Sequence, residues 1–153
     1  MEVRIFNCMV MATALFVAMS VTANANETTA RALRLAQQPL ADTKPGNLEK
    51  GKDVYIHRKK GNCLACHGVK ELENVPFHGE VGPPLDDVGG RLSESQIRLQ
   101  LIDAKVNNPD SIMPAYYRSE GLNRVLKKWK GKTILSAQEI EDVVAYLMTL
   151  KGE

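Results

Sequence analysis

Two cysteines and a histidine lie close together near the middle of the chain, in the order Cys63, Cys66 and His67. Each thiol can add across one vinyl group of a porphyrin, and the two intervening residues let the backbone span both vinyl groups in about one helical turn. The histidine that follows directly then lies beneath the iron, where its imidazole can serve as an axial ligand. The pattern therefore predicts one covalently attached haem c, held by Cys63 and Cys66 and ligated by His67.

Three other interpretations of this cysteine pair compete with haem attachment. A thioredoxin-like redox pair would sit near a strand–helix–strand pattern, and none is visible here. A zinc site needs four ligands, and the sequence has no second cysteine pair to complete one. A structural disulfide would close a very small and strained ring. The adjacent histidine favours haem attachment over all three.

Met113 is predicted to be the second axial ligand. A thioether suits haem iron opposite histidine, and this pairing raises the reduction potential. Beyond the apolar N-terminal stretch only Met113 and Met148 remain, and Met148 lies in an apolar helical segment where methionine usually serves packing. Met113 lies in a loop and is held by Pro114. His78 and His57 are the other candidates, although a lone histidine outside such a motif is more often a surface residue.

A proline-rich loop is predicted to orient the axial histidine. Metal-bound histidine normally donates its other ring N–H to a carbonyl or carboxylate, which fixes the orientation of the ring. The backbone carbonyl of Pro83 is the predicted acceptor for His67, with an ordinary proline-defined turn as the alternative. Leu85, Val88 and Leu92 follow in the chain and are expected to line the haem cavity.

Three helices are expected to hold these loops in place. The first covers about residues 48–58, with Asn47 as its N-cap. The second runs from Ser93 to about Ala104, and the third begins at Ser136 and continues toward the C-terminus. Both of the later helices open with a serine followed three residues later by Gln or Glu, which is the spacing of a capping box.

The first and third helices are predicted to pack across each other. Gly51 and Tyr55 share one face of the first helix, and a glycine there lets another helix approach closely. One face of the third helix is apolar and consists of Ile140, Val143, Val144 and Leu147. We expect an all-α domain of residues 47–153 that wraps around one haem.

The N-terminus is expected to be removed from the mature protein. Residues 1–25 contain a basic start at Arg4, a long apolar run and a small-x-small site at residues 23–25, as in a cleaved signal peptide. The apolar run is too short for a membrane anchor, so no membrane span is expected after cleavage. Export to the bacterial periplasm also suits the three cysteines, because one would leave with the signal peptide and haem would consume the other two.

The remaining segments carry weaker signals. Residues 26–46 are polar and interrupted by prolines, and are interpreted as a mobile N-terminal extension, with an arm that orders against a partner subunit as the alternative. Trp129 lies among the lysines of residues 127–132, which form either a solvated basic loop or a contact surface. The near-balanced net charge of +2 argues against nucleic acid as a partner.

With these residues placed, the chain resembles the class I cytochromes c. Within them it is similar to the SoxX family, the monohaem subunits of the SoxAX complex of bacterial thiosulfate oxidation. The resemblance runs from about residue 46 to 151 and rests on four segments, residues 60–67, 82–85, 108–116 and 134–147.

The resemblance implies a class I cytochrome c fold in which Cys63 and Cys66 hold the haem and His67 and Met113 ligate it. It also implies a heterodimer with a SoxA-type subunit that houses the catalytic haem. In the family the complex couples thiosulfate oxidatively to a cysteine of the SoxYZ carrier, an L-cysteine S-thiosulfotransferase reaction. This chain would be the non-catalytic haem subunit that passes electrons to a downstream periplasmic cytochrome. The alternative is a freestanding electron shuttle with exposed lysines around the haem edge.

Overall fold

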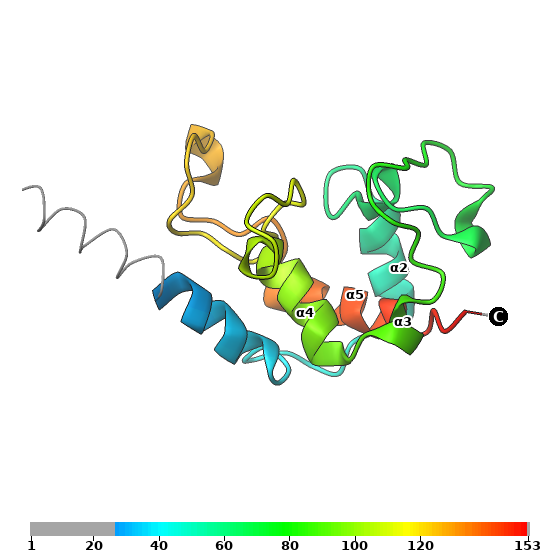
Figure 1. Ribbon diagram of the computed structural model, residues 1–153, viewed down its shortest axis with the longest axis horizontal. Coiled ribbons are helices and arrows are strands. Elements are labelled where there is room, and N and C mark those ends of the chain that lie inside the picture. Colours follow the sequence, from blue (N-terminus) through cyan, green and yellow to red (C-terminus); the bar gives the residue numbers. More distant parts are fainter. Residues whose placement is uncertain (1–26, 153) are drawn as a thin grey trace, which may run out of the picture.

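The computed structural model describes residues 27–152, so the predicted signal peptide of residues 1–25 lies outside them (Figure 1). Within this range the regular elements are all helical, which confirms the all-α expectation. The longer helices are α2 (Leu48–Ile56), α4 (Glu94–Asp103) and α5 (Ala137–Leu147), with the single turn α3 (Val88–Arg91) and a helix over residues 27–36. Short 3-10 turns cover Cys63–Ala65, Lys70–Leu72, Ala104–Val106 and Lys127–Trp129. None of the helices in residues 27–152 has both the length and the hydropathy that a bilayer crossing requires.

The three long helices begin where the capping signals predicted. The side chain of Asn47 accepts a hydrogen bond from the backbone N–H of Lys50 and so caps α2. Ser93 and Ser136 each form a complete capping box, at the starts of α4 and α5 respectively. These bonds satisfy backbone donors that the first turn of a helix leaves unpaired.

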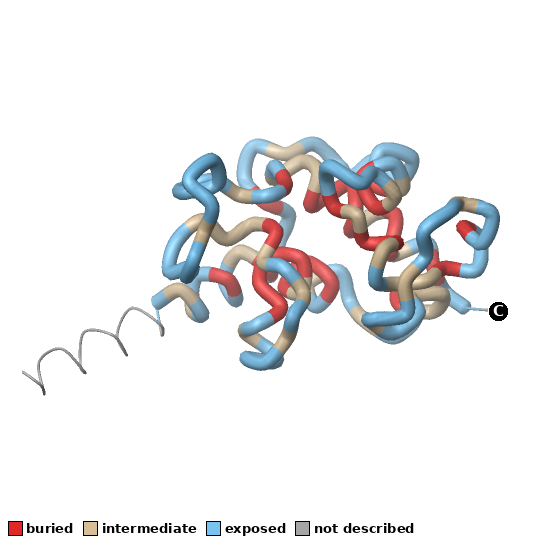
Figure 2. The backbone as a smooth tube through the Cα atoms, turned by 90° about the horizontal axis from the view of Figure 1, so that it is seen from above, coloured by how far each residue is buried: buried red, intermediate tan, exposed pale blue. Residues whose placement is uncertain are grey.

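Helices α2 and α5 cross at a glycine, as predicted. A Cβ atom added at Gly51 would overlap the backbone carbonyl of Asp142 and come within 2.9 Å of the Cβ of Tyr146. Beside this contact the rings of Tyr55 and Tyr146 meet edge to face, with their centroids 5.5 Å apart. Buried residues gather on the inner sides of these helices, whereas the outer loops are exposed (Figure 2). The crossing fixes α2, and with it the haem-attachment motif that follows.

The interpretation of residues 26–46 as a mobile extension is wrong for residues 27–46, which we call the N-terminal segment. Ala32, Ala36 and Leu40 of this segment are buried in the main hydrophobic core. Further along, the backbone N–H of Lys44 donates to the side chain of Gln138 in α5 over 2.8 Å. The segment therefore packs along its own domain, and Figure 1 shows its helix (blue) beside α4.

A buried ion pair lies under the N-terminal segment. The guanidinium of Arg98 in α4 donates two hydrogen bonds, of 2.8 and 2.9 Å, to the carboxylate of Glu141 in α5. These side chains are 2 % and 5 % exposed. The pair also binds the segment itself, because Arg98 donates to the carbonyl of Ala36 over 3.0 Å and Glu141 accepts from the N–H of Leu40 over 3.0 Å. Buried charges of this kind require such complete pairing.

Candidate haem-binding site

One cavity of about 600 Å³ opens between the Cys63–His67 motif, the loop that follows it, α3, α4 and the loop of residues 108–116. Its size lies within the range of about 300–1,000 Å³ that is common for cofactor and ligand sites. Leu85, Val88 and Leu92 line the cavity, as predicted from the sequence, together with Ile97 and Leu101. The wall is therefore largely apolar and suits a flat hydrophobic group.

The two cysteines of the attachment motif, residues 63–67, lie about one turn apart on this wall. The backbone N–H groups of Cys66 and His67 both donate to the carbonyl of Cys63, over 3.0 and 2.8 Å, so all three residues face the same cavity. Cys63 is buried and Cys66 is exposed, and the two sulfur atoms are not joined in a disulfide. Burial raises the pKa of the Cys63 thiol to about 12. A thioredoxin-like pair instead depends on a lowered thiol pKa, which the burial of Cys63 does not provide.

The imidazole of His67 is held by a backbone carbonyl. Its Nδ1 lies 2.8 Å from the carbonyl oxygen of Pro83, the acceptor expected from the sequence. Donation from Nδ1 leaves Nε2 free to bind a metal ion, which is the usual arrangement for a metal-bound histidine. The backbone of His67 is also held, because the Tyr55 hydroxyl donates to its carbonyl over 2.7 Å. Burial raises the pKa of Tyr55, so this hydroxyl stays protonated and remains a donor.

Residues 79–85 form a strap that lies along the attachment motif. Backbone N–H groups of Gly79 and Gly82 donate to the carbonyls of Leu64 and Cys66, over 3.0 and 2.8 Å. The two glycines are required by space, since a Cβ at Gly79 would overlap the carbonyl of Ala65. A Cβ at Gly82 would overlap the His67 ring and lie 2.6 Å from its Nδ1. These contacts were not predicted from the sequence, where the local signal for them was a pair of glycines three residues apart beside two prolines.

Met113 lies across the chain on the loop of residues 108–117, which we call the methionine loop. Its side chain is half-buried and lines the same cavity as His67. Tyr116 anchors this loop through two hydrogen bonds, one from its backbone and one from its side chain. Its N–H donates to the carbonyl of Leu101 over 3.0 Å, and its hydroxyl donates to the carbonyl of Gly61 over 2.9 Å. Tyr116 thereby ties the methionine loop to the attachment motif.

The other candidate ligands lie elsewhere. His57 and His78 are exposed, and neither is among the residues that line the cavity. Met148 packs against the hydrophobic core, also away from the cavity. The fold thus brings together two thiols, one imidazole and one thioether around a single apolar cavity. This donor set fits haem c with histidine and methionine as its axial ligands.

Comparisons with known proteins identify the family of the chain. The family model for cytochrome c matches residues 48–151. A chain of the crystal structure of SoxXA from P. pantotrophus is 40% identical, with a TM-score of 0.68 over 75% of this chain and 88% of that chain. The methylamine utilization protein MauG of Methylophilus methylotrophus is 30% identical in a 123-residue alignment that covers 68% of this chain. The chain spans only 36% of the length of MauG.

These matches confirm the class I cytochrome c fold that was expected from the sequence, and they support the resemblance to SoxX. The match begins at the start of α2, so the N-terminal segment lies before it. The chain belongs to the cytochrome c family.

Proposed function

We propose that this chain is the electron-transfer subunit of a periplasmic SoxAX-type complex, exported by cleavage of a signal peptide after Ala25. The observation that carries the proposal is the single cavity lined by Cys63, Cys66, His67 and Met113. The 40% identity to a chain of SoxXA is the reason for proposing a role in sulfur oxidation.

The residues around the cavity fit a carrier of single electrons. Cys63 and Cys66 would hold one haem c through thioether bonds, and His67 and Met113 would fill both axial positions. When bound, the haem supplies a one-electron iron couple, and methionine opposite histidine raises its potential. The Pro83 carbonyl fixes the His67 ring, and the apolar wall keeps water away from the site. With both axial positions filled, thiosulfate would have no open position at this iron.

The covalent sulfur chemistry therefore belongs to a partner in this proposal. A SoxA-type subunit would form the heterodimer and house the catalytic haem. The complex would couple thiosulfate to a cysteine of the SoxYZ carrier as an L-cysteine S-thiosulfotransferase. This chain would accept the released electrons and relay them to a downstream periplasmic cytochrome. Once the signal peptide is removed, its thiols are Cys63 and Cys66, both committed to the haem.

Co-purification with a SoxA-type subunit tests this proposal. The mature holo-protein is expected to elute as a heterodimer with that subunit. In the presence of SoxYZ, thiosulfate should then reduce its haem, which is read from the visible absorption bands. Omission of SoxYZ is the control and should abolish the reduction. A protein that elutes alone and stays oxidised would contradict the proposal.

A freestanding electron shuttle is the second candidate, and the exposed lysines of residues 127–132 favour it. Transient partners steered by charge associate in a strongly salt-dependent way, whereas a stable apolar interface is affected little by salt. Size-exclusion chromatography of the SoxA-type complex at low and high salt separates the two. A heterodimer that survives high salt supports the subunit, and one that dissociates supports the shuttle.

A further inference from the structure

The positive charge of the protein is concentrated in one loop. Residues 121–132, which we call the basic loop, contain five of the 20 Lys and Arg residues and none of the 18 Asp and Glu residues. The remainder of the chain then has 15 basic and 18 acidic residues and is net negative. The five cations of the basic loop are Arg124, Lys127, Lys128, Lys130 and Lys132, and all are exposed.

These cations are not neutralised by the domain that carries them. Several basic residues outside the loop pair with carboxylates, for example Lys60 with Glu139 at 2.8 Å and Arg118 with Asp103 at 2.7 Å. By contrast, none of the five cations forms an ion pair with any residue in the part of the chain that the structure describes. The five cations therefore create a positive electrostatic potential around the loop, which attracts negatively charged groups of an approaching molecule.

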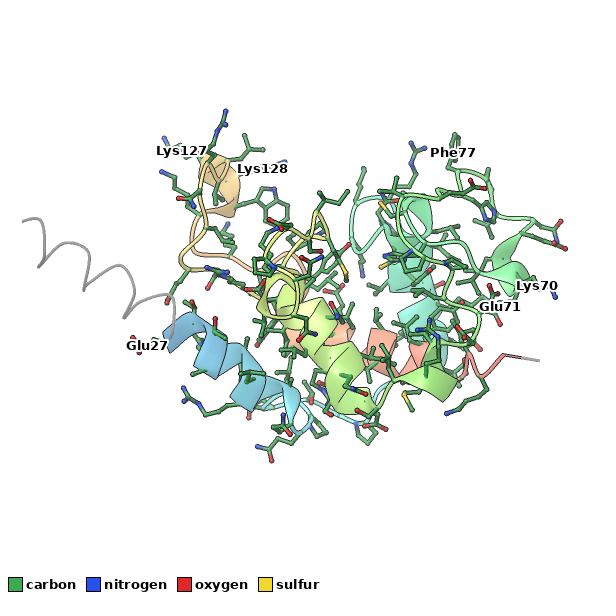
Figure 3. The ribbon with its side chains drawn as sticks, viewed as in Figure 1. Glu27, Lys70, Glu71, Phe77, Lys127 and Lys128 are labelled. Carbon is green, nitrogen blue, oxygen red and sulfur yellow. The ribbon has the colours of Figure 1, made fainter. Side chains whose placement is uncertain are left out.

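The basic loop is anchored at its base and projects from the body. Arg118 donates to the carbonyls of Glu120 and Gly121, over 2.8 and 2.7 Å. At its tip the Lys127–Trp129 turn is closed by a 2.8 Å hydrogen bond from the N–H of Trp129 to the carbonyl of Leu126. Figure 1 shows the loop (orange) rising from the same side as the methionine loop (yellow). In Figure 3 Lys127 and Lys128 lie at its outer end. A loop shaped in advance loses less entropy when a partner binds.

Apolar side chains are interleaved with the charges. Leu126 is 68% exposed and Trp129 is 37% exposed, beside the two lysines of the turn. Next to them lies a hollow of about 390 Å³ whose lining includes Arg124 and Lys130. Tryptophan and arginine, here Trp129 and Arg124, are enriched at protein interfaces, whereas the lysines supply the long-range charge.

We propose that the basic loop is a docking surface for an acidic protein partner. Carboxylates of the partner would face the five cations, one of them entering the hollow between Arg124 and Lys130, while Leu126 and Trp129 contact an apolar patch. A protein is favoured over an anionic lipid surface because a flat headgroup layer offers no side chain to fill this hollow. This inference deepens the charge-steered association considered above, because it names the residues of the surface and the chemistry of the partner. The surface can serve either a subunit or a freestanding carrier.

The test uses the mature holo-protein and flavodoxin, a small acidic one-electron carrier, as the probe. Reduction of the haem by reduced flavodoxin is followed by stopped flow. The loop variant is Lys127→Gln/Lys128→Gln/Lys130→Gln. At low salt its second-order rate constant is expected to fall about tenfold. The difference from the unaltered protein should vanish as salt rises from about 0.01 to about 1 M, where the Debye length shrinks from about 30 to about 3 Å.

A matched control separates the place of the charges from their number. Arg34→Gln/Lys44→Gln/Lys50→Gln removes the same three charges from exposed positions outside the loop. Both triple variants are compared near 0.1 M salt, where the Debye length is about 10 Å and charges far from the docked partner are largely screened. Under this condition the control is expected to slow the reaction less than about twofold. Equal slowing by both triple variants, or no slowing by the loop variant, overturns the proposal.

Two further measurements complete the test. Leu126→Ser is expected to raise the dissociation constant for flavodoxin about fivefold or more, because an exposed leucine at a docked interface loses its apolar contact. Sedimentation with phosphatidylglycerol vesicles provides the lipid comparison. If the loop residues are needed for binding to vesicles but not to flavodoxin, the proposal is wrong and the surface binds lipid.

Discussion

Replacement of Arg98 by methionine tests whether the buried ion pair holds the N-terminal segment in place. The change keeps most of the side-chain volume but removes the two bonds to Glu141 and the bond to the carbonyl of Ala36. It leaves a carboxylate that is 5 % exposed without its cation. Removing one partner of a buried pair costs about 3–5 kcal/mol of unfolding free energy. For a domain of this size the melting temperature should fall by roughly 10–20 °C.

The matched control is Arg91→Met. Arg91 also forms an ion pair, with Asp87 at 2.8 Å, but these side chains are 49% and 50% exposed. Exposed pairs contribute about 0–1 kcal/mol, so this variant should melt close to the unaltered protein. Thermal unfolding of the two holo-proteins is followed by far-UV circular dichroism. Equal stability of the Arg98→Met and Arg91→Met proteins would refute the reasoning.

A double variant separates the lost charge pair from the lost packing. Arg98→Met/Glu141→Leu removes both charges, although the N–H of Leu40 then loses its acceptor. The double variant should be at least about 1 kcal/mol more stable than the sum of the single changes predicts, because the residues interact directly.

Trypsin cleavage after Arg34 should accelerate in Arg98→Met, since the N-terminal segment is released, while the haem spectrum stays unchanged.

Three further predictions concern the haem site. Gly82→Ala is expected to displace the His67 ring or the strap, because the new Cβ would lie 2.6 Å from Nδ1, and an altered Soret band with a shifted potential would reveal it. Met113→Ala should lower the reduction potential by on the order of 0.1 V or more and abolish sulfur ligation. Met148→Leu, measured by the same redox titration, should leave the potential unchanged. Tyr55→Phe should cost about 0.5–1.5 kcal/mol in guanidinium unfolding, because the part-buried His67 carbonyl loses its donor.

The features that were predicted correctly are recognisable from patterns of residues close together in the chain, even where, as in the helix crossing, the contact itself joins distant segments. Capping at Asn47, Ser93 and Ser136 is determined within four residues of each helix start, so the sequence alone located it. The Cys63–His67 motif is equally local. The roles of His67 and Met113 as axial ligands stay predictions. The glycine crossing of α2 and α5 followed from an apolar face opposite a residue without a side chain.

The features that were missed depend on residues far apart. Tyr116 and Gly61 are 55 positions apart, and their hydrogen bond joins the two halves of the haem cavity. Arg98 lies in α4 and Glu141 in α5, and no local pattern showed that the two side chains would meet. The N-terminal segment was misjudged for the same reason, because its polar composition conceals an ordered contact that α4 and α5 provide.

The sequence by itself determined the chemistry of the protein, since thiols, imidazole and thioether are fixed by residue type and by spacings of a few residues. It also determined the helices, because caps and apolar periodicity act within one or two turns. Only the tertiary structure decided how close the strap lies to the His67 ring, where the buried charge finds its partner, and that the N-terminal segment is part of the domain. Those outcomes depend on excluded volume and on desolvated charges, which take effect only when distant parts of the chain meet.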